Sequence, residues 1–155
     1  MFKNSIKSLL AMSILMVVLL VAGCGGSESG GPRVSGLTTE ATVKAFFDAA
    51  KNDRTNEATL YVSPISKSDP QTVLKFMTGQ TGIEQIKNLD IFSIKQVALQ
   101  GNYAAVVVTM QDQNNVKVVK PVGLEKIKGQ WYIVDVDQIY TNAKYKVLQQ
   151  LLGNI

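Results

Sequence analysis

The sequence predicts an α+β domain in which N-terminal helices pack on a four-stranded antiparallel meander, with a further helix at the C-terminus. Apolar residues recur at helical spacing through much of 39–77, whereas the spacing becomes extended after Leu89. Short turns separate the successive extended segments, which is typical of neighbouring antiparallel strands. Helical spacing returns in 138–152.

The first helix is predicted at 39–52. Thr38 or Thr39 can cap its N-terminus, and Glu40 lies in the first turn, where the helix dipole favours a carboxylate. Glu40 is also expected to pair with Lys44 one turn later. The apolar residues of this segment are spaced at i, i+3, i+4 and i+7, which predicts a buried face formed by Val43, Phe46, Phe47 and Ala50.

Two shorter helices are predicted next. One spans 56–62 and ends ahead of Pro64, because the residue before a proline disfavours helical backbone. Another begins at Asp69-Pro70, a capping residue followed by proline at the first helical position. Its apolar side consists of Val73, Phe76 and Met77. The segment 82–88 fits either a short helical turn or a loop.

Strands are predicted at 91–99, 103–111, 116–127 and 130–136. The third contains Pro121 and Gly123, and because proline cannot donate to a ladder, a bulge or bend is expected there. The tail, 138–152, is predicted as a helix that could plug an opening in the domain, extend a dimer interface or lie free. One side of it is apolar and consists of Tyr140, Ala143, Val147, Leu148 and Leu151.

The N-terminal segment is predicted to be a secretion signal. Lys3 and Lys7 precede an apolar run over 9–22, and no acidic residue precedes Cys24. As a helix this run would rise about 21 Å, which is shorter than the roughly 30 Å hydrocarbon core of a bilayer. The alternatives are an uncleaved anchor and an ordinary signal that leaves a free thiol.

The segment 20–24 (LVAGC) resembles the lipobox of bacterial lipoproteins. The resemblance implies signal cleavage between Gly23 and Cys24 and a diacylglyceryl group on the Cys24 sulfur, whose two chains hold a protein stably at a membrane. The protein is then exported and lipid-anchored to the cell envelope. With Gly25 after the cysteine, the destination is the outer membrane in a bacterium with two membranes, and the outer face of the plasma membrane in a bacterium with one.

The expected organisation has four parts. A signal peptide occupies 1–23, and a lipidated cysteine with a flexible Gly/Ser-rich tether occupies 24–36. The folded domain spans 37–137 and is followed by a helical extension at 138–155.

Composition excludes several functions. Loss of Lys3 and Lys7 with the signal lowers the formal net charge from +4 to +2, which is no nucleic-acid footprint. The chain has no histidine and one cysteine, so it lacks the commonest metal ligand and any disulfide. We expect no cofactor, metal or nucleic acid, and the expected first partner is the membrane, through diacylglyceryl-Cys24.

Three segments carry a family resemblance: 39–53 (TEATVKAFFDAAKND), the helix ending at Ser63-Pro64, and 124–135 (LEKIKGQWYIVD). They resemble lipoproteins with a DUF4878-type domain, within the NTF2-like (cystatin-like) fold, over about 37–137. The resemblance implies a cone in which a curved sheet wraps the long first helix and can leave a pocket. The family has no assigned activity, so no functional residue follows from it.

Four carboxylates lie nearest the predicted framework: Asp48, Asp53, Asp135 and Asp137. Some NTF2-like enzymes, including ketosteroid isomerases, use an aspartate base and a tyrosine-containing oxyanion hole. Phenols are available here at Tyr61, Tyr103, Tyr132 and Tyr140. Asp48 lies off the apolar face of its helix, and no spacing is diagnostic of catalysis. Inert aspartates are therefore the favoured interpretation, and no residue is assigned as catalytic.

Seven aromatic residues could line a pocket of the cone: Phe46, Phe47, Tyr61, Phe76, Phe92, Tyr103 and Trp131. For Trp131, Phe46, Phe47 and Phe92, packing in the core is the favoured interpretation. Four lysines cluster on the third strand and its turn, where a solvated strand edge is favoured over a surface for lipid headgroups: Lys117, Lys120, Lys126 and Lys128.

These observations predict a lipid-anchored envelope lipoprotein whose domain binds an envelope protein or a small apolar ligand without catalysis. One alternative is an NTF2-like isomerase or hydratase with an aspartate base in the cone pocket. Another is a structural or assembly lipoprotein that acts through its C-terminal helix.

Overall fold

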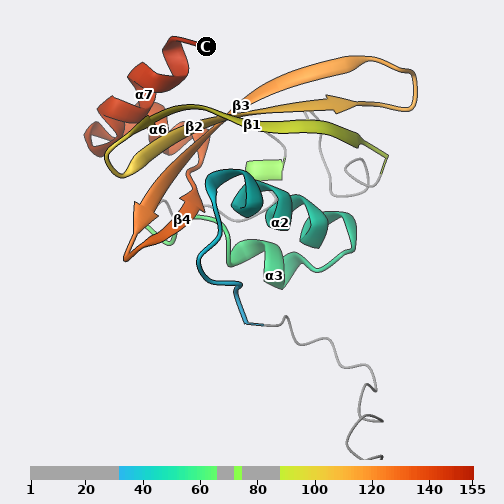
Figure 1. Cartoon of the computed structure of the whole chain (residues 1–155), viewed down its shortest axis with the longest axis horizontal. Coiled ribbons are helices and arrows are strands. Elements are labelled where there is room, and N and C mark those ends of the chain that lie inside the picture. Colours follow the sequence, from blue (N-terminus) through green and yellow to red (C-terminus); the bar gives the residue numbers. More distant parts are fainter. Residues whose placement is uncertain (1–31, 66–71, 75–87) are drawn as a thin grey trace, which may run out of the picture.

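The computed structural model describes residues 32–65, 72–74 and 88–155 (Figure 1). The predicted signal, Cys24 and its lipobox, most of the predicted third helix and nearly all of 82–88 lie outside the described residues. The described part is α+β, as the sequence predicts. One antiparallel sheet has the strand order β1-β2-β3-β4, formed by β1 (Asp90–Gln100), β2 (Tyr103–Gln111), β3 (Lys117–Ile127) and β4 (Gln130–Ile133).

Helices cover both faces of this sheet. The helix α2 (Thr39–Lys51) lies against one face, with α3 (Thr55–Thr59) beside it. The C-terminal elements α6 (Val136–Thr141), η2 (Ala143–Tyr145) and α7 (Lys146–Gly153) lie on the opposite face. Figure 1 shows that the sheet is curved, because β4 and the adjoining end of β3 turn down beside α2.

The helix α2 forms as predicted, with Thr38 as its cap. The Thr38 hydroxyl accepts the Ala41 N–H at 3.2 Å, which satisfies one of the free donors at the helix start. The apolar face Val43, Phe46, Phe47 and Ala50 is fully buried. The expected Glu40–Lys44 pair is wrong: Lys44 pairs with Asp48, and the Glu40 carboxylate accepts the N–H of Gln96 on β1 at 3.1 Å.

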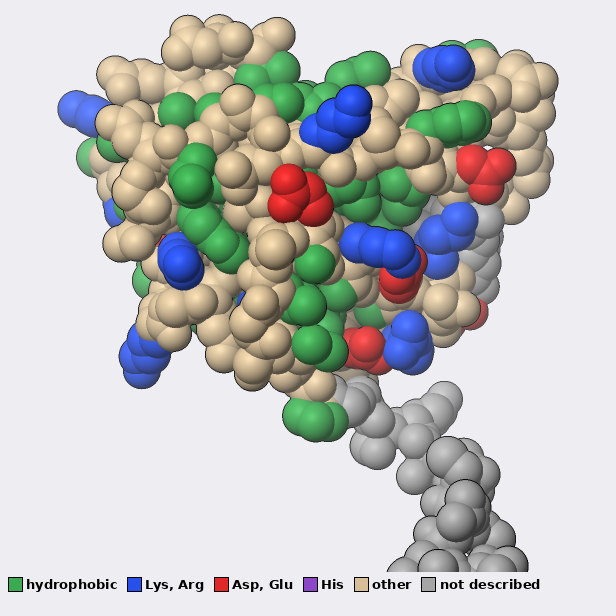
Figure 2. Space-filling view, viewed as in Figure 1, with side chains coloured by type: hydrophobic (Ala, Val, Ile, Leu, Met, Phe, Trp, Pro, Cys, Tyr) green, Lys and Arg blue, Asp and Glu red, His purple; other side chains and the backbone are tan. Residues whose placement is uncertain are grey.

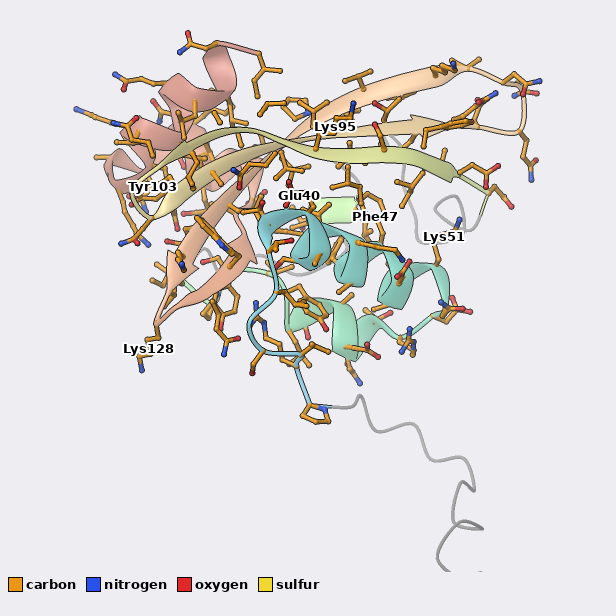
Figure 3. All side chains as sticks on the ribbon, in the orientation of Figure 1. Glu40, Phe47, Lys51, Lys95, Tyr103 and Lys128 are labelled. Carbon is orange, nitrogen blue, oxygen red and sulfur yellow. The ribbon has the colours of Figure 1, made fainter. Side chains whose placement is uncertain are left out.

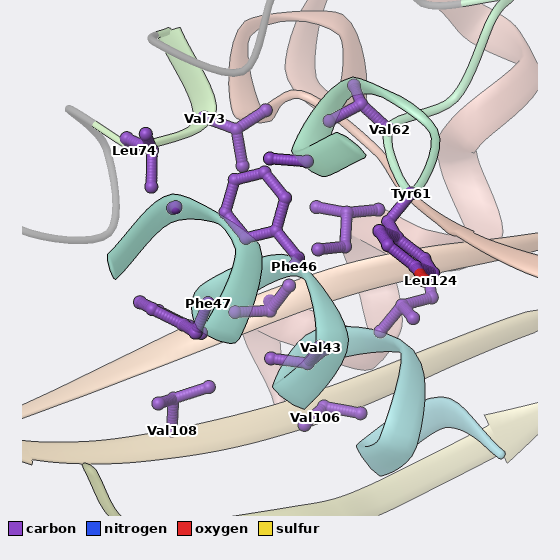
Figure 4. Close-up of a cluster of buried hydrophobic side chains, with 14 of the residues drawn as sticks. Val43, Phe46, Phe47, Tyr61, Val62, Val73, Leu74, Val106, Val108 and Leu124 are labelled. Carbon is purple, nitrogen blue, oxygen red and sulfur yellow. The ribbon is translucent and has the colours of Figure 1, made fainter. Parts of the chain in front are cut away.

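The space between α2 and the sheet is filled by side chains (Figure 4). Phe46 and Phe47 meet edge to face, with ring centroids 5.8 Å apart. Tyr61 from the segment after α3 and Leu124 from β3 complete this core and are also fully buried. Buried side chains therefore occupy the described space between α2 and the sheet.

The helix α3 ends earlier than the predicted 56–62. After Thr59 the chain runs alongside β4, where the Ile133 N–H donates to Tyr61 O and the Ser63 N–H donates to Ile133 O, both at 2.8 Å. These long-range bonds replace the last turn of the predicted helix. Of the predicted third helix, Val73 and Leu74 are helical and buried.

The strand boundaries agree with prediction to within one residue, except that β4 ends at Ile133 rather than 136. Lys128 and Gly129 have φ of +48° and +81°, as expected for a two-residue turn that matches strand twist. Of the expected bulge or bend in β3, no bulge occurs at Pro121. Its partner is Val107 in an unbroken β2–β3 register, and the shorter β4 ends before reaching it, so its missing N–H costs no ladder bond.

The tail is not one helix. Asn142 has extended backbone, and its side chain caps the Lys144 N–H at 3.0 Å, so the chain bends between α6 and η2. Of the predicted apolar side, Leu148 is buried and Leu151 packs against it, but Tyr140 is exposed; Ile139 and Tyr145, which were not predicted on that side, are also buried. The tail neither lies free nor enters the space between α2 and the sheet.

Gly123 allows this packing. A Cβ at Gly123 would lie 2.7 Å from Ile139 Cδ1 and 2.8 Å from Leu148 Cδ2, closer than carbon atoms can approach. The backbone of β3 therefore takes the place of a side chain beneath α6 and α7.

Candidate functional site

An open groove of about 900 Å³ lies between α2 and the first half of β1. Its polar and charged walls come from α2 and its cap, and its apolar wall comes from β1. Figure 2 shows charged side chains of both signs on this face of the molecule, with hydrophobic side chains exposed beside them. The residues that line it are Thr38, Glu40, Ala41, Lys44, Asp48, Lys51, Asp90, Ile91, Phe92, Ser93 and Ile94.

The groove borders a free sheet edge, because β1 is an outer strand. In an antiparallel ladder, every second residue directs its backbone N–H and C=O groups away from the neighbouring strand. The bond from Lys126 N–H to Asn102 O shows which residues of β2 direct their backbone groups toward β3 and which toward β1. The register between β1 and β2 then places the backbone groups of Ile91, Ile94 and Gln96 on the outer edge of β1.

The first turn of α2 closes this edge at one point. The Glu40 carboxylate accepts the Gln96 N–H, and the Thr39 hydroxyl donates to Gln96 Oε1 at 2.8 Å. Figure 3 places Glu40 between α2 and β1. Among the described residues, none outside the β1–β2 ladder bonds to the backbone of Ile91 or Ile94. The open edge therefore coincides with the groove.

The charges on the groove wall are partly engaged. Lys44 pairs with Asp48 within α2, and Lys51 Nζ donates to Leu89 O at 2.7 Å. The pKa of Glu40 is lowered by its own backbone N–H and, against a raising effect of burial, by the Gln96 N–H and nearby hydroxyls. The Glu40 carboxylate is thus held in the charged form that the edge cap requires.

Phe92 is an exposed aromatic residue at the β1 rim of the groove. It lies at a bulge of β1, between the paired residues Ile91 and Ser93, and 59% of it is exposed. Lys117 Nζ approaches its ring to 5.6 Å. The favoured interpretation of Phe92 as a core residue is therefore wrong, and among the predicted pocket aromatics that the structure describes, Phe92 alone lines this groove.

The other predicted pocket aromatics lie elsewhere. Phe46, Phe47, Tyr61 and Trp131 are core residues, which confirms the favoured interpretation for both phenylalanines and for Trp131. Tyr103 lies on the opposite face of the sheet, where its ring meets that of Tyr145 edge to face with centroids 6.2 Å apart. Phe76 lies outside the described residues.

The predicted carboxylates do not converge on one site. Asp48 is half exposed in its pair with Lys44, and Asp53 has φ of +57° in the turn after α2. Asp135 is buried but caps α6 by accepting the Asp137 N–H at 3.4 Å. It lines a hollow of about 30 Å³, which has room for a water molecule and none for an organic substrate.

A buried polar cluster was missed by the sequence reasoning. The Glu125 carboxylate on β3 accepts hydrogen bonds from Ser63 Oγ, from Lys144 Nζ and, at 2.9 Å, from the Tyr145 hydroxyl. Glu125 is 2% exposed, and its three donors come from two segments far apart in the chain, one holding Ser63 and the other the adjacent Lys144 and Tyr145. A charged residue at an inward position of a strand was the available signal, since a buried carboxylate requires partners.

The Glu125 cluster ties the C-terminal elements to the sheet. Burial acts to lower the pKa of Lys144, but the hydrogen bond and charge of Glu125 raise it overall. Burial and then Glu125 raise the pKa of Tyr145. Both oxygen atoms of the Glu125 carboxylate accept hydrogen bonds, so we interpret this cluster as structural.

The four lysines of the third strand and turn do not form one cluster. Lys117 lies at the start of β3 beside Phe92, whereas Lys126 Nζ lies 5.4 Å from the Trp131 ring at the other end. Lys128 lies in the β3–β4 turn (Figure 3). The strand's length separates the two ends by about 30 Å.

No protein-family model matches the chain, and no curated protein matches its sequence. Among the helices of the described residues, none is both long and apolar enough to cross a membrane.

Proposed function

We propose that this protein is a lipid-anchored lipoprotein of the cell envelope, exported by residues 1–23 and held at the membrane by diacylglyceryl-Cys24. Its folded domain is a binding module without catalytic activity, and the groove between α2 and β1 is the binding site. The observation that carries the second part is the open groove of about 900 Å³ on the surface, beside a core in which Phe46 and Phe47 are fully buried. This volume is at the upper end of the roughly 300–1,000 Å³ of ligand sites.

We also propose that the domain has the NTF2-like cone fold. The curvature of the sheet around α2 supports this, as does the single meander β1-β2-β3-β4. The cone interior is filled by Phe46 and Phe47. A binding site on the outer rim, rather than inside the cone, is consistent with that filling.

The other candidate functions have less support. An isomerase or hydratase needs a carboxylate facing a substrate-sized space, and Asp135, the buried aspartate among the described residues, is engaged as a helix cap. A module acting through its C-terminal helix needs a free apolar face, whereas Leu148 and Ile139 are buried against the sheet.

Anchoring is tested by expressing the full chain with Cys24→Ser and, as a matched control in the same segment, Ser29→Ala. We expect Cys24→Ser to abolish incorporation of a clickable fatty acid and to release the protein from membranes, and Ser29→Ala to change neither. Unaltered processing and membrane retention of Cys24→Ser would contradict the proposal.

Binding at the groove is tested separately in living cells, with a photo-crosslinking amino acid at Phe92 or, as a control, at the equally exposed Tyr140, which does not line the groove. A crosslinked species specific to position 92 is expected. Identical crosslinking patterns at both positions would assign no binding role to the groove.

A further inference from the structure

We propose that the occupant of the groove is an extended peptide segment of a partner protein, which pairs as an additional strand with the edge of β1 at Ile91–Ile94. This inference rests on the proposed binding role of the groove and names the partner's chemistry. It joins three observations: unpaired backbone groups at the edge of β1, an exposed aromatic side chain at the same place, and a groove wall whose basic side chains are already engaged by other groups of the protein.

The backbone groups come first. Ile91 and Ile94 direct N–H and C=O groups out of the sheet into the groove. A sheet edge of this kind binds an extended chain through main-chain hydrogen bonds, and nearby pockets select alternate side chains. At about 3.3 Å per residue, this edge accommodates a segment of a few residues.

The limits of the edge define how far along β1 an added strand can pair. At Gln96 the edge is occupied by Glu40 and Thr39. At a second bulge, between Gln96 and Ala98, the strand departs from regular pairing. Beyond Ile94 an added strand would have to displace the Glu40 carboxylate, whose lowered pKa reflects how well its charged form is held there. The open stretch is therefore short and specific.

Side chains supply the selectivity. Phe92 offers an exposed ring within the open stretch, so the partner places an apolar side chain against it. The two basic residues of the wall are engaged, Lys44 by Asp48 and Lys51 by Leu89 O. Among the described charges of the groove, Asp90 is the exposed one that forms no salt bridge, which favours a Lys or Arg at that end of the peptide.

The test uses the full chain in mild detergent as bait for a phage-displayed library of random peptides. Selected peptides are synthesised with a fluorophore, and binding is measured by anisotropy. We expect an apolar residue and a basic residue to recur, and Phe92→Ala to weaken binding about tenfold. The control Tyr140→Ala removes an equally exposed aromatic and should leave affinity unchanged. Asp90→Asn should weaken peptides that carry the basic residue.

Strand pairing is tested on the unmodified protein, so that the result does not depend on the folding of a variant. Peptides with N-methyl groups at alternate backbone positions should lose binding in one methylation pattern and keep it in the other. Amide hydrogen exchange of the segment around Ile91 and Ile94 should slow when peptide binds. Equal binding of both methylated peptides would overturn the proposal, as would failure to select any peptide.

A second copy of the chain is the competing occupant. Sedimentation velocity of the full chain tests this alternative, and we expect it to show no concentration-dependent dimer. A dimer that Phe92→Ala abolishes would overturn the proposal in favour of edge-to-edge self-association. Failure of the proposed function is distinguishable, because lipid anchoring is read from Cys24→Ser and groove occupancy from crosslinking at position 92. Crosslinking specific to position 92 without any peptide binding would refute the proposal that the occupant is an extended peptide, and would leave the binding role of the groove standing.

Discussion

The Tyr145 hydroxyl donates a hydrogen bond of 2.9 Å to the buried carboxylate of Glu125, and so connects the C-terminal elements to β3. Tyr145 is itself fully buried, between the sheet and α7. The pair is thus part of the packing that makes the tail a component of the domain rather than an appendage.

Tyr145→Phe should lower the free energy of unfolding by about 1–3 kcal/mol, because a buried carboxylate loses one of its donors. Tyr140→Phe removes a hydroxyl from an exposed tyrosine and is the matched control, with an expected change within about 0.5 kcal/mol. Urea denaturation of the two variants measures both values. Equal stability of the two variants would mean that the Glu125–Tyr145 bond has no net effect.

High pH should weaken the hydrogen bonds of Lys144 and Tyr145 to Glu125. The pKa values of Lys144 and Tyr145 are both raised, so both groups hold their protons more tightly in the folded state. Their contribution to stability is present below their ordinary values of 10.5 and 10.0 and is lost as the pH rises through the higher folded-state values. Unfolding free energies between pH 8 and 11 should fall less steeply for Tyr145→Phe combined with Lys144→Met than for the wild type.

Low pH should weaken the hydrogen bond between the Glu40 carboxylate and the Gln96 N–H. The pKa of Glu40 is lowered, so its contribution is present above its ordinary value of 4.5 and disappears as the pH falls through the folded-state value. Glu40→Gln should therefore be less stable than the wild type at pH 6 and differ from it progressively less toward pH 3. A difference that is constant with pH would assign the effect to packing instead of charge.

Gly123→Ala should lower the free energy of unfolding by about 1–3 kcal/mol, because the added Cβ forces Ile139 and Leu148 away from the sheet. Gly153→Ala is the control, since open space surrounds that position at the end of α7. Thermal denaturation compares the two. Full stability of Gly123→Ala would show that α6 and α7 do not pack closely on β3.

Phe46→Ala should cost about 3–5 kcal/mol, because Phe46 fills the space between α2 and the sheet. Phe92→Ala should change stability by less than about 0.5 kcal/mol, because that side chain is largely exposed. Urea titration of both variants tests the assignment of one phenylalanine to the core and the other to the groove. A small effect of Phe46→Ala would indicate a hollow interior.

Local sequence was sufficient for the features that depend on neighbours in the chain. The spacing of Val43, Phe46, Phe47 and Ala50 predicted the buried face of α2, and Thr38 was one of the two residues expected to cap it. The residue types at Lys128-Gly129 predicted a tight turn. In each case the physical cause, whether helical period, capping or allowed backbone angles, acts over a few residues.

Long-range packing decided the rest. Ser63 and Glu125 are 62 positions apart and meet across the fold, and Glu40 turned to Gln96 instead of Lys44 because α2 begins beside the β1 edge. Gly123 has a role because two helices from later in the chain cross β3 there. Phe92, expected in the core, came to lie in the groove at a bulge that depends on pairing with β2. Such contacts have no local signature, because each depends on where the topology brings distant segments together.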